Sequence, residues 1–153
     1  QDLIDVFQKI YFDGGKGLIK NEKFLFDKKI IEELEKDYHL AVFTGRPKQE
    51  ALFALKNAGV EEYFYPVITM DDLPADRQKP DTLGIEKIIS RVNTDKIYYF
   101  GDTNDDMICG TNAKLTAIGV LPPQNQSDEK KKGLVSNGAE AVITTINDIK
   151  KVI

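Results

Sequence analysis

The chain has 153 residues, of which 41% are hydrophobic and 30% charged, a size and composition that suit one globular domain with its own core. Its 21 basic and 25 acidic side chains give a net charge of −4, which argues against a nucleic-acid or anionic-membrane partner. The single cysteine cannot form an internal disulfide. No apolar run approaches the roughly 18 residues of a membrane span, and no signal-peptide pattern opens the chain. We therefore expect a cytoplasmic protein.

Hydrophobic periodicity predicts the elements in chain order. The first half reads as a helix (3–11), a loop (13–17), an amphipathic helix (28–36), a buried strand (39–44), a helix from Pro47 to near Gly59, and a strand (67–70). The second half reads as a polar loop (71–80), a helix (83–92), a strand (96–100), a helix (105–113), a strand (115–120), a Pro-rich loop (121–126), a helix, a short strand (141–143) and a final helix. Strands that alternate with helices predict an α/β fold with a parallel sheet and helices on both faces.

Three short motifs lie at or after predicted strand ends, the edge where open parallel sheets bind ligands. The first is Phe43-Thr44-Gly45-Arg46-Pro47. A hydroxyl at a strand tip, followed by a free N–H and a helix N-terminus, can bind a phosphoryl group, and Gly45 lets the backbone approach closely. The alternative is that Thr44 only caps the helix that follows Pro47.

The second motif is Lys79-Pro80-Asp81, in the polar loop. A lysine in such a loop is a point charge for a phosphate or a carboxylate. The alternative is an ordinary surface lysine. Only the position of Lys79 in the sequence, between the other two motifs, favours a binding role over this alternative.

The third motif runs from Gly101 to Asp106 and contains three aspartates. Carboxylates just past an apolar strand are costly unless they bind a cation or hydrogen-bond donors, and such hard oxygen ligands suit Mg²⁺. The alternative is an Asp-rich turn in which Asp105 caps the next helix. Asp102 directly after the strand is harder to explain in that way.

Thr44, Lys79, and Asp102 with Asp106 resemble, in the right order, the second, third and fourth motifs of the haloacid-dehalogenase-like superfamily. The tail, residues 115–120 and 137–143, resembles its phosphoglycolate-phosphatase-like branch. Two further stretches, 43–47 and 119–123, resemble a subgroup linked to histidine biosynthesis. The resemblance implies a three-layer Rossmann-like α/β core.

The family's first motif, Asp-x-Asp-Gly, is absent from this sequence. Its closest counterpart is Tyr11-Phe12-Asp13-Gly14, where a tyrosine with an ordinary pKa near 10 stands in place of the nucleophilic carboxylate. The resemblance implies that residues 1–26 are the remnant of a helical cap and the connection to the core. Residues 27–153 would then be the core without its central first strand, and the nucleophile would lie upstream of Gln1.

The resemblance implies an Mg²⁺-dependent phosphatase that hydrolyses a small phosphate monoester through an aspartyl-phosphate intermediate. Thr44 and the Gly45 N–H would hold the phosphoryl oxygens, and Lys79 would neutralise charge on the nucleophile and the phosphoryl group. Asp102 would bind Mg²⁺ directly, and Asp106 would either bind the ion or orient it without direct contact. The partners would be a small phosphorylated substrate and the missing N-terminal segment. A phosphomutase and a non-catalytic binding or regulatory domain remain alternatives, and the fragment alone should be inactive.

Three structural expectations follow. Thr44, Lys79, Asp102 and Asp106 should line one cleft. The strands that end at Thr44 and Gly101 should not be hydrogen-bonded to each other, with a gap of about 10 Å, or two strand spacings, between them. The two remaining candidates for catalysis, His39 and Cys109, should be structural, because the first starts its strand and the second lies on a helix among apolar neighbours.

Overall fold

The structure, a computed structural model, describes residues 3–94 and 96–153. The chain divides into two compact units, residues 1–72 and 73–153. The expected boundary between residues 26 and 27 falls inside the first unit and stays a prediction.

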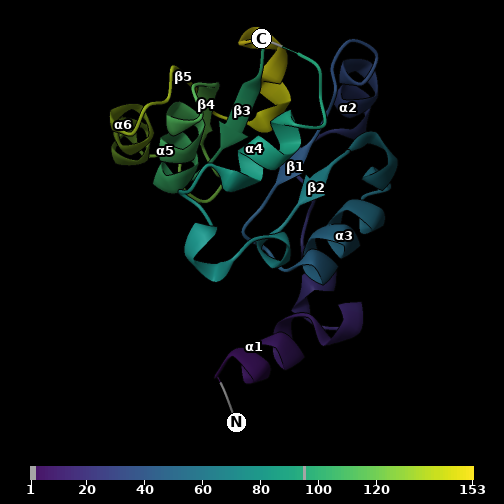
Figure 1. Ribbon diagram of the computed structural model, residues 1–153. Coiled ribbons are helices and arrows are strands. Elements are labelled where there is room, and N and C mark those ends of the chain that lie inside the picture. Colours follow the sequence, from purple (N-terminus) through teal and green to yellow (C-terminus); the bar gives the residue numbers. More distant parts are fainter. Residues whose placement is uncertain (1–2, 95) are drawn as a thin grey trace. The chain divides into compact units, whose positions relative to one another are not determined.

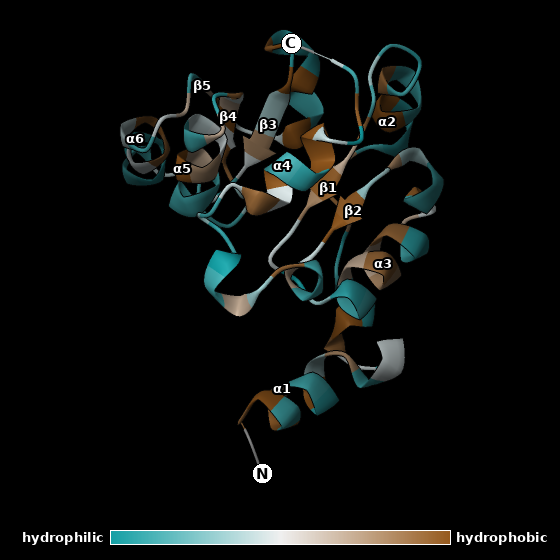
Figure 2. Ribbon diagram, viewed as in Figure 1, coloured by the Kyte–Doolittle hydropathy of each residue, from teal (hydrophilic) through white to brown (hydrophobic). Residues whose placement is uncertain are grey.

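The first unit contains a β–α–β arrangement (Figure 1). Two parallel strands, β1 (Val42–Phe43) and β2 (Val67–Ile68), are joined through helix α3 (Lys48–Asn57). Figure 2 shows that both strands are hydrophobic. Helix α2 (Lys28–Leu34) begins where the Asp27 carboxylate accepts the Lys29 N–H at 2.9 Å, and its Ile31 packs in a buried core. The predicted helices and strands of this half are thus confirmed, although both strands are shorter than the apolar runs that predict them.

The N-terminal segment consists of helix α1 (Leu3–Tyr11) and the 3-10 helices η1 (Asp13–Gly15) and η2 (Leu18–Asn21). No described residue of α1 is buried, and its apolar side chains are exposed: Leu3, Ile4, Phe7 and Ile10 among them. The turn after α1 requires a glycine at position 15, because φ is +89° there and a Cβ would lie 2.5 Å from the Phe53 ring. The segment is therefore a defined helix and turn, with an apolar face that the rest of the described chain leaves uncovered.

The second unit is built on a three-stranded parallel sheet in the order β3-β4-β5. Its elements are helix α4 (Leu83–Ile89), strand β3 (Tyr98–Gly101), helix α5 (Asn104–Asn112), strand β4 (Thr116–Val120), helix α6 (Asp128–Ser136), strand β5 (Ala141–Ile143) and the 3-10 helix η6 (Ile146–Lys151). Helices α5 and α6 pack on the sheet and on each other. Their shared core is made of Met107, Ala117, Leu121, Leu134 and Ala139. The predicted final helix is a 3-10 helix.

Three short 3-10 helices lie in the connections between α3 and α4: η3 (Glu61–Tyr63) before β2, and η4 (Met70–Asp72) and η5 (Ala75–Arg77) after it. The segment predicted as a polar loop over 71–80 therefore contains two of these turns. Across the residues described, no helix is both long and apolar enough to cross a membrane.

Strand pairing is defined within each unit, where β1 pairs with β2 and β3 pairs with β4. Because β1 and β3 belong to different units, the expectation that they are not hydrogen-bonded to each other, with a gap of about 10 Å between them, stays a prediction.

Candidate functional site

Thr44 lies directly after β1, where its N–H donates to the Ile68 carbonyl at 2.9 Å. Its Oγ1 accepts the Arg46 N–H at 3.1 Å. Helix α3 begins at Lys48, its N-cap is Pro47, and no side chain caps it there. The alternative that Thr44 caps this helix is therefore wrong, and because the hydroxyl oxygen accepts from Arg46, its proton remains available to a bound anion.

Gly45 is exposed, and a side chain at this position would meet no other atom within 4 Å. A ligand therefore has room beside the turn. The first amide of the helix that follows is already engaged, since Lys48 N–H donates to the Asp71 carboxylate at 2.7 Å. The turn formed by the half-buried Thr44 and the exposed Gly45 is thus the part of this motif that leaves room for a ligand.

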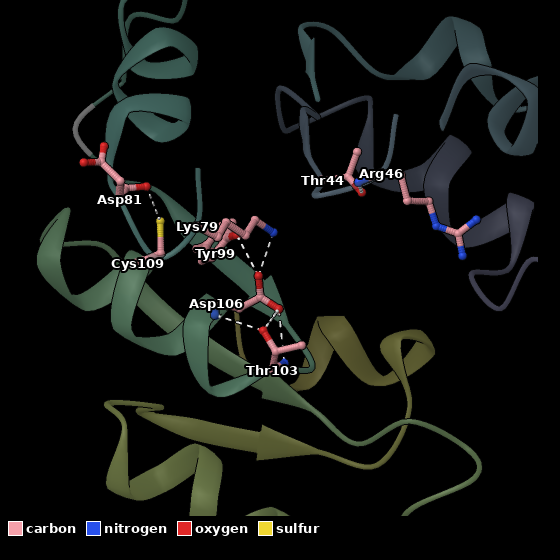
Figure 3. Close-up of polar contacts among 8 residues, drawn as sticks. All are labelled: Thr44, Arg46, Lys79, Asp81, Tyr99, Thr103, Asp106 and Cys109. Atoms are coloured by element: carbon pink, nitrogen blue, oxygen red, sulfur yellow. Dashed lines mark hydrogen bonds and ion pairs between the residues drawn. The ribbon is translucent and has the colours of Figure 1, made fainter. Parts of the chain in front are cut away.

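Lys79 and Asp106 form a mostly buried ion pair in the second unit (Figure 3). The Lys79 Nζ lies 2.7 Å from Asp106 Oδ1, and the side chains are only 19% and 7% exposed. Burial would raise the pKa of Asp106, but the Lys79 charge and hydrogen bonds from Lys79 and Thr103 lower it. Asp106 therefore stays ionised, and it holds the Lys79 ammonium group in a fixed position.

Two further residues hold Asp106 in place. Thr103 and Asp106 form a reciprocal capping box at the start of α5, with the Thr103 hydroxyl and N–H on Oδ2 at 2.7 and 3.1 Å. The Tyr99 hydroxyl donates to Oδ1 at 3.1 Å, and burial and the Asp106 charge raise the pKa of Tyr99 far above its ordinary value. The prediction that Asp105 caps α5 is wrong, because Thr103 is the N-cap and Asp105 lies in the first turn.

The close approach of Asp106 to the end of β3 requires a glycine there. A Cβ at Gly101 would collide with the Asp106 side chain. The pair Gly101-Asp102 therefore serves two purposes, since the glycine admits Asp106 and the aspartate follows at the tip of the strand.

Asp102 is exposed directly after β3 and offers the hard carboxylate oxygen that Mg²⁺ takes. Proteins often hold this ion with one or two carboxylates together with substrate phosphate oxygens and water, so this donor set fits it. Both oxygens of Asp106 already accept hydrogen bonds, which suits Asp106 to orienting neighbours rather than to binding a metal directly. Among residues 3–94 and 96–153, no group of three or more His, Cys, Asp or Glu side chains gathers as a metal site.

His39 and Cys109 have surroundings that fit structural roles. His39 is exposed and precedes β1, at the end of the strand opposite Thr44. Cys109 is fully buried in α5, and its Sγ–H donates to the Asp81 carbonyl at 3.2 Å. Burial raises the pKa of the Cys109 thiol to about 11, which leaves almost no thiolate at neutral pH.

The structure thus brings Lys79 and Asp106 together and places Asp102 on the turn between β3 and the Asp106 helix. Thr44 and Gly45 belong to the first unit, so their convergence with this group stays a prediction. Sequence reasoning missed Tyr99 and Thr103. The spacing Thr-x-x-Asp could have indicated the capping box, whereas Tyr99 reads as an ordinary strand residue.

Parallel strands joined by helices, with polar side chains after the carboxyl ends of β1 and β3, define a Rossmann-like α/β protein. The sequence profile of the haloacid dehalogenase-like hydrolases matches residues 22–120, more than half of the chain. The chain belongs to this family.

The chain is also similar to individual proteins. The chain is 32% identical over 122 residues to an imidazoleglycerol-phosphate dehydratase from Phytophthora nicotianae, covering 77% of this chain and 27% of that protein. It is 32% identical over 88 residues to the pyrophosphatase PpaX from Listeria welshimeri, covering 56% of this chain and 40% of that one. The crystal structure of a putative beta-phosphoglucomutase from Thermotoga maritima covers the whole chain with a TM-score of 0.78 at 22% identity, and 72% of that structure is matched. The chain thus spans half or less of these two curated relatives.

Proposed function

We propose that the chain supplies most of the active site of an Mg²⁺-dependent phosphatase that hydrolyses a small phosphate monoester. The observation that carries the proposal is the Lys79 ammonium, held 2.7 Å from a mostly buried Asp106 on the helix that follows Asp102. A cation fixed in this way can stabilise the charge of a phosphoryl group without reorganisation during the reaction. Membership of a hydrolase family, with a pyrophosphatase among the relatives, supports the same reaction class.

In this proposal each residue of the site has a defined role. The Thr44 hydroxyl, whose oxygen already accepts from Arg46, donates its proton to a phosphoryl oxygen, and the Gly45 N–H donates to another. Lys79 neutralises the phosphoryl group and the attacking carboxylate, and Asp106 with Tyr99 keeps Lys79 in position. Asp102 holds Mg²⁺, which, when bound, offsets the negative charge of the substrate phosphate.

The nucleophile belongs to a segment outside these 153 residues. No Asp-x-Asp sequence occurs in the chain, and the Tyr11 hydroxyl is engaged with Glu22. We place the missing motif upstream of Gln1, because in the family it precedes the Thr44 motif. A carboxylate oxygen of its first aspartate attacks phosphorus while the bond to the leaving oxygen breaks, and the second aspartate protonates that oxygen. The second aspartate then deprotonates a water that attacks phosphorus, which releases phosphate and restores the first carboxylate.

The test is turnover of p-nitrophenyl phosphate by the complete protein with Mg²⁺, with the 153-residue chain alone as negative control. Replacing Lys79 with alanine should lower kcat by about 10²- to 10³-fold, the range for loss of one preorganised charge-stabilising donor. Lys131→Ala, on an exposed position of α6, is the matched control and should keep wild-type kcat.

Two results would contradict the proposal. One is a Lys79→Ala variant with the kcat of the control. The other is a complete protein that binds inorganic phosphate but releases none from the ester, which is the behaviour of a non-catalytic binding domain.

A further inference from the structure

A second polar cluster, made of Tyr11, Glu22 and Arg46, joins three distant parts of the first unit. Arg46 forms a two-pronged pair with Glu22, Nη1 to Oε2 at 2.8 Å and Nη2 to Oε1 at 3.1 Å. The Tyr11 hydroxyl donates to Glu22 Oε1, and Arg46 Nη1 also donates to the Tyr11 oxygen at 3.2 Å. The end of α1, the residue after η2 and the turn after β1 are thereby held at one point.

The electrostatics of this Tyr11–Glu22–Arg46 cluster favour the charged pair. Hydrogen bonding from Arg46 lowers the pKa of Glu22, and the bond to Glu22 raises the pKa of Arg46. Bidentate guanidinium–carboxylate pairs fix direction as well as distance. Both side chains are about two-fifths exposed, so solvent limits the strength of the pair to that of a surface interaction.

Arg46 is part of the turn that carries Thr44. Its N–H donates to Thr44 Oγ1 at 3.1 Å, and its carbonyl accepts the Met70 N–H at 3.3 Å. The Arg46 side chain extends away from Thr44 (Figure 3), so its guanidinium anchors the turn from outside rather than sharing the ligand position. A contact that holds the Arg46 side chain therefore also holds the Arg46 N–H, which is the donor that orients the Thr44 hydroxyl.

A further contact ties the same N-terminal segment to α3. Gln8 Nε2 donates to Glu50 Oε1 at 2.7 Å, and Glu50 is only 5% exposed. The position of α1 is therefore defined by two sets of polar contacts, one of them at the turn after β1.

We propose that Glu22 is a positioning residue for phosphate binding: it acts through Arg46 to hold the Thr44–Gly45 turn. The inference rests on the proposed function, in which this turn holds the phosphoryl oxygens. The inference also assigns a role to Tyr11, which stands in the position of the nucleophile in Tyr11-Phe12-Asp13-Gly14. In the cluster, Tyr11 helps to hold Glu22 and Arg46.

Kinetics of the complete protein with p-nitrophenyl phosphate provide the first test. Glu22→Gln should raise KM about fivefold, the limit for a partly exposed pair, with a smaller change in kcat. Glu61→Gln, an exposed glutamate of η3, is the matched control. In an Arg46→Gln background, Glu22→Gln should add nothing further, because its effect passes through Arg46.

Amide exchange in the complete protein provides a test that needs no activity. Glu22→Gln should speed exchange of the Arg46 amide about fivefold while the amides of β4 stay at wild-type rates, which also shows that the variant is folded. Unchanged Arg46 exchange together with unchanged KM would overturn the inference. Absence of turnover in the wild-type complete protein would overturn the proposed function instead, and the exchange of the Arg46 amide would still decide whether Glu22 holds the turn.

Discussion

At the scale of single residues, Asp72 has one of the densest sets of polar contacts in the first unit. Its Oδ2 accepts the N–H and the hydroxyl of the fully buried Thr69 at 2.9 and 2.8 Å, and its Oδ1 accepts the Lys48 ammonium at 2.9 Å. Burial would raise the pKa of Asp72, but the hydrogen bonds from Lys48 and Thr69 outweigh it and lower the pKa to about 2. The carboxylate thus stabilises the end of β2 only while it is ionised.

This gives a pH-dependent prediction. Because the folded-state pKa lies below the ordinary value of 3.8, the stabilisation is complete above about pH 4 and is lost as the pH falls toward 2. Asp72→Asn should lower the free energy of unfolding at pH 6 by on the order of 1 kcal/mol, because the half-exposed Lys48 is screened by water. The difference from wild type should shrink as the pH approaches 2.

Urea unfolding at several pH values measures this difference. Asp37→Asn, at an exposed position of the same unit, should unfold as the wild type does at every pH. A constant difference between Asp72→Asn and wild type across the range would contradict the assigned pKa.

Single residues also show where sequence reasoning succeeds. Lys79 and Asp106 could be singled out because each lies in a motif in the segment that follows a predicted strand, and the structure joins them. The partners Glu22 and Arg46 could not, because they are 24 positions apart and no local spacing connects them. The capping error at Asp105 arose because a run of aspartates does not reveal which side chain faces the first turn of the helix.

At the scale of elements, α6 depends on one side chain. Leu134 is the only buried residue among those described in this helix, and its side chain packs against Gly119 of β4. Its neighbour Val135 is 52% exposed. The remaining positions of α6 are mostly charged or small, so the attachment of the helix rests on this apolar contact.

Leu134→Ala should therefore destabilise the protein strongly. Removal of a fully buried leucine side chain typically costs about 2–5 kcal/mol, since a cavity remains. The matched change Val135→Ala should cost less than about 0.5 kcal/mol. Urea unfolding followed by circular dichroism measures both, and equal midpoints for the two variants would show that α6 is not anchored in this way.

The order and type of most elements could be predicted, because apolar periodicity and turn residues mark them directly. Their extents could not. The apolar run 39–44 yields only Val42–Phe43 as strand, although its backbone hydrogen bonds to the β2 segment extend from the Leu40 carbonyl to the Thr44 N–H. The last predicted helix becomes 3-10, since six residues between Thr145 and Val152 give little room for helical hydrogen bonds.

At the scale of the whole molecule, the sequence predicts that β1 and β3 are not paired with each other, and this stays a prediction because the two strands belong to different units. The prediction needed only the missing Asp-x-Asp strand and the resemblance in strand order. The substrate could not be predicted, because the motif residues bind the phosphoryl group and carry no information about the remainder of the ester. The convergence of Thr44 with Lys79 and Asp102 remains the prediction on which the proposed site depends.

The buried thiol of Cys109 has a consequence for how the second unit can be studied. It is the single cysteine of the chain, it is fully buried, and it donates to the Asp81 carbonyl. Iodoacetamide can reach it only when the second unit opens, so the rate of alkylation measures that opening. Alkylation should be at least 10³-fold slower in the native chain than in urea, and Leu134→Ala should speed native alkylation by about 30-fold or more. If native Cys109 reacted as fast as an unfolded thiol, the burial described for its side chain would be contradicted. A slow reaction would make this sulfur atom an internal kinetic reporter of local opening that requires no added label site.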